Sequence, residues 1–149
     1  MVGEHDFTEF VELTKTLRMQ RYDADQYVFK QGDEPDNAYV IVFGTCDVKV
    51  SFTYNKWGSV KQKVLTMCKL ESKSLFGELS LLFKGKRTAS IITKESCSML
   101  VVPNFAFRKY MKTLYLQKLS MIVKFYRSLS FMDNMPTSVI LILASKTEL

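Results

Sequence analysis

The chain of 149 residues has little of several residue types that would direct its chemistry, with three cysteines, one histidine, one tryptophan and three prolines. It also lacks long apolar runs. The longest, residues 139–144, is far shorter than the roughly 20 residues that a membrane-spanning helix needs. The first six residues are acidic and have neither the basic start nor the apolar stretch of a secretory signal. We therefore expect no secretory signal and no membrane segment in this sequence.

The three cysteines, Cys46, Cys68 and Cys97, are widely spaced and odd in number. This usage favours a reducing compartment, the cytoplasm, over a disulfide scaffold. The cysteines lack the paired spacing of zinc ligands, and His5 is the single histidine, so we expect no metal site and no cofactor. His5 lies in a stretch predicted to be a disordered lead-in, and nothing near it would make it a catalytic base.

The formal net charge is +6, and several of the 21 lysines and arginines fall between Lys56 and Arg87. A basic excess suits a nucleic acid, a membrane surface or a small anionic ligand. The simplest explanation is a solvated lysine-rich face. Charge alone therefore does not choose a partner, and a specific constellation of residues is needed.

Apolar residues at helical spacing predict a helix over residues 7–18. Short runs rich in β-branched and aromatic residues then predict strands at residues 27–29, 38–43, 48–52, 64–70, 90–93 and 98–102. Residues 53–63 are mostly polar and are predicted to form a hairpin loop, whereas residues 78–83 are apolar enough for a helical turn. Many short strands at close spacing favour a small barrel or roll.

Helical patterns return after Pro103. Asn104 is a candidate helix cap, and helices are predicted at residues 105–112, along the apolar stripe of residues 116–129, and at residues 137–146. The last helix has almost no polar face. Its apolar residues would be exposed in a free chain, so we expect it to pack against something else.

The most informative stretch is residues 76–91, Phe-Gly-Glu-Leu-Ser-Leu-Leu-Phe-Lys-Gly-Lys-Arg-Thr-Ala-Ser-Ile. Gly77 precedes a short predicted helix, so the backbone can approach a ligand closely, and a helix N-terminus suits a phosphate. Arg87 follows Glu78 by nine residues and is the residue type preferred for bidentate phosphate recognition. Thr88 adds a hydroxyl donor beside it.

Glu78 conflicts with a bound anion, since like charges ~7 Å apart repel by about 2 kcal/mol at an effective dielectric constant of about 20. A site that holds both needs a compensating cation, which Arg87 supplies. It also needs a neutral donor for the carboxylate, which sugar hydroxyls would supply. A cyclic nucleotide has one phosphate charge and one free 2′-hydroxyl, and so meets both requirements.

Residues 76–91 closely resemble the phosphate-binding cassette of the cyclic nucleotide-binding domain family. That family includes the regulatory subunits of the cAMP-dependent kinase, the cGMP-dependent kinase and cyclic-nucleotide-regulated channels. Residues 31–41 resemble its first strand-turn-strand, Gly44 falls where the family has a tight turn, and residues 103–105 resemble the entry to its first C-terminal helix. The resemblance spans about residues 25–111. It implies a mainly β fold, an eight-stranded β-roll (jelly roll) with a short cassette helix between N- and C-terminal helices.

The resemblance also implies the ligand contacts, position by position. Glu78 would bind the ribose 2′-hydroxyl, Arg87 would pair with the cyclic phosphate, and Gly77 would approach the ribose. Backbone N–H groups of Ser80 and Ala89 would assist. The complete implied ligand-binding set is Gly77, Glu78, Leu79, Ser80, Arg87, Thr88 and Ala89.

The base is less defined by the sequence. Thr88 stands where cGMP kinases and channels carry threonine, whose hydroxyl can reach the phosphate and the guanine amino group of syn-bound cGMP. Some threonine-bearing channels prefer cAMP, so cAMP and cGMP both stay open. Candidate walls for the base are Val64, Leu65 and Met67. A candidate aromatic lid over the base is Phe125 or Tyr126.

Two residues depart from the family pattern. Lys73 stands where a glycine often precedes the Phe-Gly-Glu block, and Lys86 stands where many members have proline. The first would alter the preceding turn and the second adds a positive charge. Neither removes a main ligand contact.

The sequence thus predicts an N-terminal helical segment at residues 1–20, the roll at 21–103, C-terminal helices at 104–132, and the start of a second, truncated domain at 133–149. The implied function is a sensor that relays cyclic-nucleotide occupancy through its C-terminal helices, with further domains of a longer chain as partners. It would not be an enzyme, because a metal-dependent phosphodiesterase centre needs several His and Asp ligands.

Two alternatives stay open. The first is a ligand-free domain of the same fold that makes protein contacts, in which Glu78 and Arg87 form a structural ion pair. The second is a nucleic-acid binder, as in bacterial regulators of similar fold. The second ranks last, because no helix-turn-helix candidate follows the roll.

Overall fold

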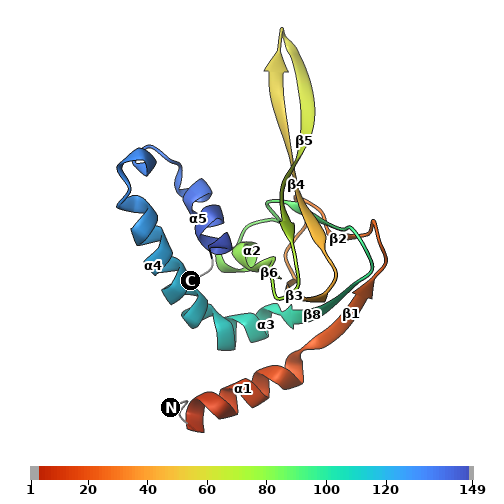
Figure 1. Ribbon diagram of the computed structural model, residues 1–149, viewed down its shortest axis with the longest axis vertical. Helices are drawn as coiled ribbons and strands as arrows, with labels where there is room; N and C mark the ends of the chain where they lie inside the picture. The colour runs from red at the N-terminus through yellow and green to blue at the C-terminus, as the bar shows by residue number, and fades with distance from the viewer. Residues whose placement is uncertain (1–3, 148–149) are drawn as a thin grey trace. The chain divides into compact units, whose positions relative to one another are not determined.

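The computed structural model describes residues 4–147, which divide between Phe107 and Arg108 into two compact units (Figure 1). We refer to residues 4–107 as the roll unit and to residues 108–147 as the helical unit. The roll unit begins with helix α1 (Glu4–Thr16) and contains eight strands. The strands are β1 (Arg18–Tyr22), β2 (Tyr27–Phe29), β3 (Asn37–Phe43), β4 (Cys46–Lys56), β5 (Ser59–Leu70), β6 (Leu75–Phe76), β7 (Ser90–Thr93) and β8 (Cys97–Pro103).

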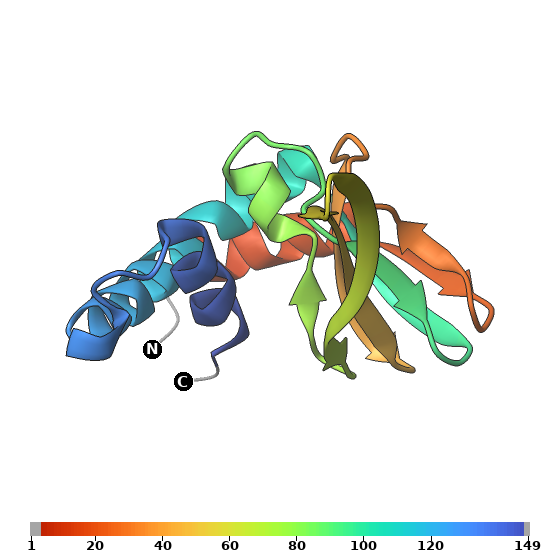
Figure 2. The same ribbon diagram turned by 90° about the horizontal axis from the view of Figure 1, so that it is seen from above.

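The strands form two four-stranded antiparallel sheets, with the orders β1-β8-β3-β6 and β2-β7-β4-β5 (Figure 2). The short helix α2 (Glu78–Leu82) connects β6 of the first sheet to β7 of the second. This architecture confirms the predicted mainly β roll with an inserted helix.

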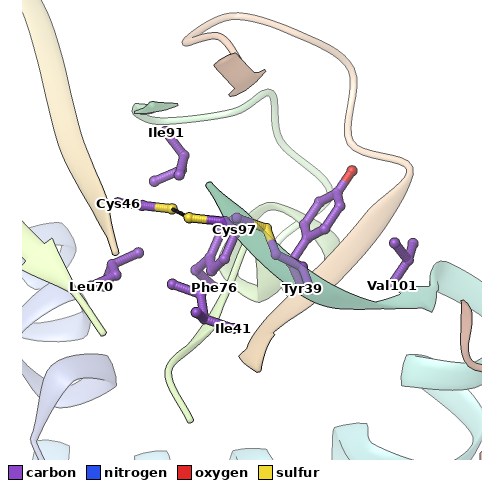
Figure 3. Close-up of a cluster of buried hydrophobic side chains, with 9 residues drawn as sticks. Tyr39, Ile41, Cys46, Leu70, Phe76, Ile91, Cys97 and Val101 are labelled. Carbon is purple, nitrogen blue, oxygen red and sulfur yellow. Dashed lines mark hydrogen bonds between the residues drawn. The ribbon is translucent and has the colours of Figure 1, made fainter. Parts of the chain in front are cut away.

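The core of the roll unit is made by side chains from both sheets (Figure 3). Its fully or nearly fully buried members are Tyr39, Ile41, Cys46, Leu70, Phe76, Ile91, Cys97, Met99 and Val101. Phe29 packs beside this cluster, with ring centroids 5.9 Å from those of Tyr39 and Phe76. The ring cluster joins β2, β3 and β6, and it places β6 so that the chain leaves the core directly into α2.

Two strand predictions are wrong. β1 was not predicted as a strand, and it begins at the last residue of the helix predicted over residues 7–18. Its first four residues are all exposed and so show no alternation, although the strand pairs with β8 along its full length. The loop predicted at residues 53–63 is a continuous antiparallel ladder from β4 into β5. Only Trp57 and Gly58 turn, with φ values of 50° and 78°, the left-handed pair that a two-residue hairpin requires.

Three helix predictions also need correction or refinement. The backbone of His5 lies within α1, so the predicted disordered lead-in is wrong at this residue. Asn104 is the first residue of helix α3 (Asn104–Ala106), and Pro103 occupies the cap position in its place. The helix predicted over residues 105–112 is broken into α3 and a π-helical turn, η1 (Phe107–Met111).

The helical unit consists of α4 (Lys112–Arg127), a 3₁₀ turn η2 (Ser130–Met132) and α5 (Thr137–Lys146). α5 coincides with the helix predicted at residues 137–146. Leu119 and Ile122 of α4 pack against Ala144 of α5. None of the helices in residues 4–147 is long and apolar enough to cross a bilayer.

Candidate functional site

The segment after β6 turns sharply into α2 at Gly77. Its φ of +80° lies in the left-handed region, which glycine adopts without steric penalty. A Cβ atom at this position would lie 2.9 Å from Nη1 of Arg87 and 3.3 Å from the carbonyl oxygen of Asn37. Gly77 is therefore needed both for the turn and for the close approach of the arginine.

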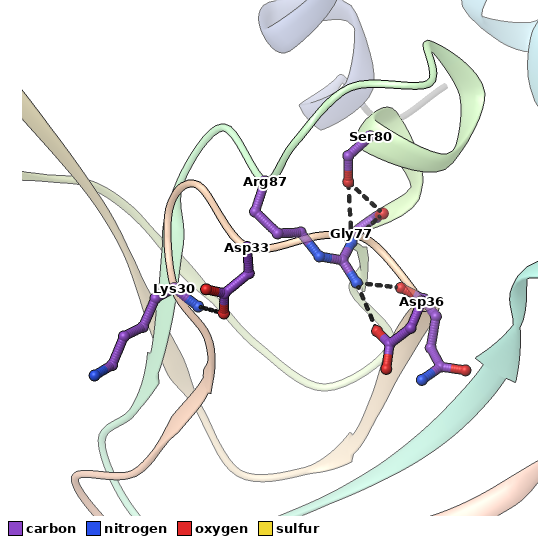
Figure 4. Close-up of polar contacts among 7 residues, drawn as sticks. Lys30, Asp33, Asp36, Gly77, Ser80 and Arg87 are labelled. Carbon is purple, nitrogen blue, oxygen red and sulfur yellow. Dashed lines mark hydrogen bonds and ion pairs between the residues drawn. The ribbon is translucent and has the colours of Figure 1, made fainter.

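Arg87 is the centre of the polar contacts at this site (Figure 4). Its Nη1 donates to the carbonyl oxygen of Gly77 at 2.6 Å and to Oγ of Ser80 at 3.0 Å. Its Nη2 donates to the carbonyl oxygen of Asn37 at 2.6 Å and lies 3.3 Å from Oδ1 of Asp36. The arginine fork thus joins the start of β3 to the turn before α2.

The guanidinium group is buried although its charge is only partly compensated. Arg87 is 3% exposed, and its Cζ lies 4.0 Å from the ring centroid of Phe29. Burial lowers the pKa of Arg87 from its ordinary value, while Tyr39 and Asp36 oppose that change. Nε of Arg87 is buried and has no hydrogen-bond partner within the described part of the chain. This buried donor therefore differs from Nη1 and Nη2, which both donate to oxygen atoms of the protein.

The backbone around Arg87 is held by the loop between β2 and β3. The amide of Gly32 donates to the carbonyl oxygen of Arg87 at 2.8 Å, and the amide of Arg87 donates to the carbonyl oxygen of Asp33 at 2.9 Å. The loop is itself closed by the Asp33 carboxylate, which accepts from the amide of Lys30 at 2.8 Å. The position of Arg87 is therefore fixed by backbone contacts as well as by its side chain.

The sequence matches the cyclic nucleotide-binding domain family over residues 19–114, more than half of the chain. The chain belongs to this family.

Similar proteins agree with this membership. The sequence is 29% identical over 113 residues to a cAMP-dependent protein kinase regulatory subunit of Dictyostelium discoideum, and 23% identical over 127 residues to the cGMP-dependent protein kinase egl-4 of Caenorhabditis briggsae. These matches cover 76% and 85% of this chain but only 32% and 15% of the two relatives. The fold resembles the cAMP-bound regulatory domain of Toxoplasma gondii PKA, with a TM-score of 0.64 at 19% identity, over 96% of this chain and 51% of that one.

The residues that the sequence singled out in the family's phosphate-binding cassette lie together in the structure. Glu78 is 2% exposed and Ser80 is 6% exposed, both on α2. Leu79 and Ala89 are half-buried, and Thr88 is exposed. The roles expected for these residues toward a ligand stay predictions.

The wall expected for the base lies on β5, where Val64, Leu65 and Met67 are 58%, 38% and 59% exposed. Successive strand residues point to opposite faces, so Val64 and Leu65 cannot line the same wall. The role of these three residues as a wall for the base stays a prediction, and at most one of Val64 and Leu65 can face the base. Phe125 and Tyr126, expected as a lid, lie in the helical unit, with ring centroids 5.7 Å apart.

Sequence reasoning did not select three residues that contact Arg87: Phe29, Asp36 and Asn37. Asp36 and Asn37 fall within the strand-turn-strand that resembles the family. Asp36 contacts Arg87 through an exposed carboxylate, and Asn37 contacts it through a backbone carbonyl group. Phe29 has the pattern of a core residue. The position of Asp36 in the sequence becomes informative only once the fold brings the start of β3 beside Arg87.

The two departures from the family pattern have different consequences. Lys73 has φ of +74° and so keeps the left-handed conformation that a glycine would adopt there. Its amide donates to the carbonyl oxygen of Ile41 at 2.7 Å, which holds the turn against β3. Lys86 forms an ion pair with Glu34 at 3.4 Å, and both side chains are largely exposed, so this pair contributes little to stability.

Proposed function

We propose that this domain binds cAMP or cGMP, with the cyclic phosphate at Arg87 and the ribose at Glu78. The observation that supports this most directly is the buried Nε of Arg87, which has no partner within residues 4–147. Leaving a buried charged donor unpaired is unfavourable by more than the roughly 1–3 kcal/mol of a neutral group. A phosphate oxygen would accept from this atom and supply the negative charge.

The electrostatic surroundings of Arg87 also favour an anion. The carboxylate of Asp36 lies 3.3 Å from Nη2 of Arg87, and that side chain is 72% exposed and thus partly screened by solvent. The other contacts are neutral oxygens of Gly77, Ser80 and Asn37. A monoanionic phosphate diester would compensate the buried charge more completely than these dipoles do.

Glu78 supports the sugar half of the proposal. Its side chain is buried at the first residue of α2, next to the glycine that Arg87 contacts. A carboxylate beside an anion site needs hydrogen-bond donors that carry no negative charge, and a ribose hydroxyl is such a donor. A free inorganic phosphate would lack this donor, so the pair selects a sugar phosphate.

Occupancy would be relayed through the C-terminal helices. The chain passes from the roll unit into the helical unit within the π-helical turn η1, an irregular helical segment of the kind that often marks functional sites. Binding would shift the population of arrangements that this segment allows. The domain would act as a sensor and not as an enzyme, and the effector would belong to other domains of a longer chain.

A second candidate function is a ligand-free domain of the same fold that makes protein contacts. It is favoured by the occupied fork of Arg87, because Nη1 and Nη2 each already have two acceptors. In that case the arginine would be a structural link between β3 and α2. The two functions differ in whether a cyclic nucleotide binds.

Calorimetric titration with cAMP and with cGMP decides between them, with 5′-AMP as the control that keeps base and ribose but opens the phosphate ring. The proposal expects binding of at least one cyclic nucleotide well below millimolar, and weaker binding of 5′-AMP. If neither binds below about 1 mM, roughly −4 kcal/mol, the ligand-free function is correct. Repeating the titrations with Thr88→Ala shows whether the exposed hydroxyl contributes to base preference, because its loss would weaken cGMP more than cAMP.

A further inference from the structure

The hairpin formed by β4 and β5 extends beyond the other strands of the roll unit (Figure 1). β4 pairs with β7 over Cys46–Lys49, so within residues 4–147 the segment 50–56 has β5 as its single strand neighbour. At the rise of an antiparallel strand, these seven residues span roughly 24 Å. We call residues 50–65 the β4–β5 ribbon.

The β4–β5 ribbon carries charge of one sign. It contains Lys56, Lys61 and Lys63 and no aspartate or glutamate. The strand register places Lys63 opposite Phe52 and Lys61 opposite Tyr54, so these four side chains share one face. Phe52 and Tyr54 are 41% and 42% exposed, with ring centroids 6.4 Å apart. Each of these two exposed aromatic rings therefore lies opposite a lysine of the neighbouring strand.

The tip of the ribbon is Trp57, the only tryptophan of the chain, which is 96% exposed. Lys56 places its Nζ 5.7 Å from the centre of the indole ring, and Val60, 72% exposed, lies on the strand that leaves the turn. An indole ring with an apolar body and one N–H donor is suited to the boundary between water and lipid. Several exposed apolar side chains gathered on one hairpin, Phe52, Tyr54, Trp57 and Val60, indicate a contact with another surface.

We propose that the β4–β5 ribbon docks on the anionic surface of a membrane, with Trp57 among the lipid headgroups and Lys56, Lys61 and Lys63 above them. Polybasic segments are attracted to the negative leaflet, and the aromatic side chains add burial at the interface. Trp57 and the three lysines lie outside the cassette and outside the wall expected for the base, so the proposal does not depend on binding of a cyclic nucleotide.

The shape and composition of the ribbon favour a membrane over the other anionic partners. The most exposed apolar side chain lies on a convex tip, which can enter a soft, flat surface but offers no groove to a nucleic-acid strand or a peptide. All cations of the ribbon are lysines. Arginine, whose planar fork is preferred for nucleic acid and for paired carboxylates, is absent from it. Lysine acts as a hydrated point charge, which suits diffuse attraction to headgroups.

The test uses the fluorescence of Trp57 as a single reporter. The full chain is mixed with phosphatidylcholine vesicles in which about a third of the lipid is phosphatidylserine, and with vesicles of phosphatidylcholine alone. We expect a blue shift and quenching by brominated lipid with the anionic vesicles only, and reversal at high salt. If anionic vesicles produce no shift, the proposal is wrong.

Matched variants locate the contact by vesicle sedimentation. Replacing Lys56, Lys61 and Lys63 together by glutamine should weaken binding about a hundredfold. Trp57→Asn, which keeps a residue tolerant of the positive φ, should weaken it about tenfold or more. The control replaces Lys118, Lys124 and Lys146 of the helical unit by glutamine and removes the same charge. Equal losses in the control and the ribbon variant would overturn the proposal.

Other occupants give distinct results. The same fluorescence titration is run with single-stranded RNA and with polyglutamate. A blue shift with either polymer, and none with anionic vesicles, assigns the ribbon to nucleic acid or to an acidic protein and rejects the membrane. Circular dichroism of each variant confirms that the roll is folded, so a loss of binding is not a loss of structure.

Discussion

The cassette and the β4–β5 ribbon are both basic regions of one roll unit, but the arginine of the cassette is buried and the lysines of the ribbon are exposed. The cassette buries a single arginine, 3% exposed, and surrounds it with backbone carbonyls, a serine hydroxyl and one carboxylate. The ribbon has three lysines and no acidic residue over residues 50–65. The first region holds its charge at one buried position, and the second presents exposed charges on a projecting surface.

The difference follows from the chemistry of the two cations. Arg87 has a planar fork that can donate in several fixed directions, and it stacks on the ring of Phe29 at 4.0 Å. A lysine in that place would have one compact ammonium group and would lack the planar fork that here contacts four oxygen atoms. We therefore propose a specific small anion for the cassette and a diffuse anionic surface for the ribbon.

The largest expected effect comes from removing the buried arginine. Arg87→Ala should weaken binding of the cyclic nucleotide by about 2–5 kcal/mol, because the phosphate loses its charge partner. It should also destabilise the roll, since the carbonyl groups of Gly77 and Asn37 lose their donor. Titration calorimetry measures the first effect and thermal unfolding the second.

Two further variants show whether this effect belongs to the cassette. Arg87→Lys keeps the charge but not the fork, so we expect a loss that is smaller than for alanine and still measurable. The ribbon variant that replaces Lys56, Lys61 and Lys63 by glutamine should leave nucleotide affinity unchanged. An unaltered affinity in Arg87→Ala would mean that the phosphate binds elsewhere and that the contrast between the two regions is wrong.

A smaller effect is expected at Gln31, which contacts both regions. Its side chain donates to the carbonyl oxygen of Ser51 at 2.9 Å and accepts from the amide of Ser51 at 2.7 Å, so it replaces a missing strand neighbour at the base of the ribbon. Its backbone amide donates to Oγ of Ser90 on β7, close to the end of the cassette.

Gln31→Ala removes the side-chain contacts and keeps the backbone one. We expect local destabilisation of about 1 kcal/mol, seen as faster hydrogen exchange of the Ser51 amide. Nucleotide affinity should not change. Gln31→Glu is the matched control, because a carboxylate can still accept from the amide but cannot donate. A loss of nucleotide affinity in Gln31→Ala would show that the ribbon and the cassette are coupled through this side chain.

The contrast between the regions also marks what the sequence can predict. Gly77 and Arg87 could be singled out from the sequence because each has a chemical requirement, glycine for the turn and arginine for an anion, and the structure brings the two residues into contact. The buried strands β3, β7 and β8 were predicted because they combine β-branched residues with turn residues at their ends. The helix α5 was predicted to the residue, since its apolar run begins after Pro136 and ends near Lys146.

Residues 53–63 of the ribbon and the strand β1 were missed. Strands that are exposed on both faces have no alternating apolar pattern, so residues 53–63 have the composition of a loop and residues 18–22 have no strand pattern. Asn37 was missed as a partner of Arg87 because it accepts through its backbone carbonyl group, which every residue type has. Contacts through the backbone depend on the fold and leave no trace in the residue type.

The smallest expected effect is a stabilisation at Lys73, in the turn that connects the ribbon strand β5 to the cassette. Its φ of +74° is unfavourable for a residue with a Cβ atom by about 1–2 kcal/mol. Lys73→Gly removes this strain but gives the unfolded chain more freedom, which offsets about 0.4–1 kcal/mol. We expect a net gain of about 0.5–1 kcal/mol in the free energy of unfolding, measured by urea denaturation.

Lys73→Ala is the control, because it removes the ammonium group and keeps the strained backbone. The alanine variant should be no more stable than the natural chain, so a gain seen only with glycine assigns the effect to φ. A less stable glycine variant would show that the lysine side chain contributes more than its strain removes. If Lys73→Gly raises stability while vesicle binding and nucleotide affinity stay constant, this turn joins the two regions in the chain without coupling them.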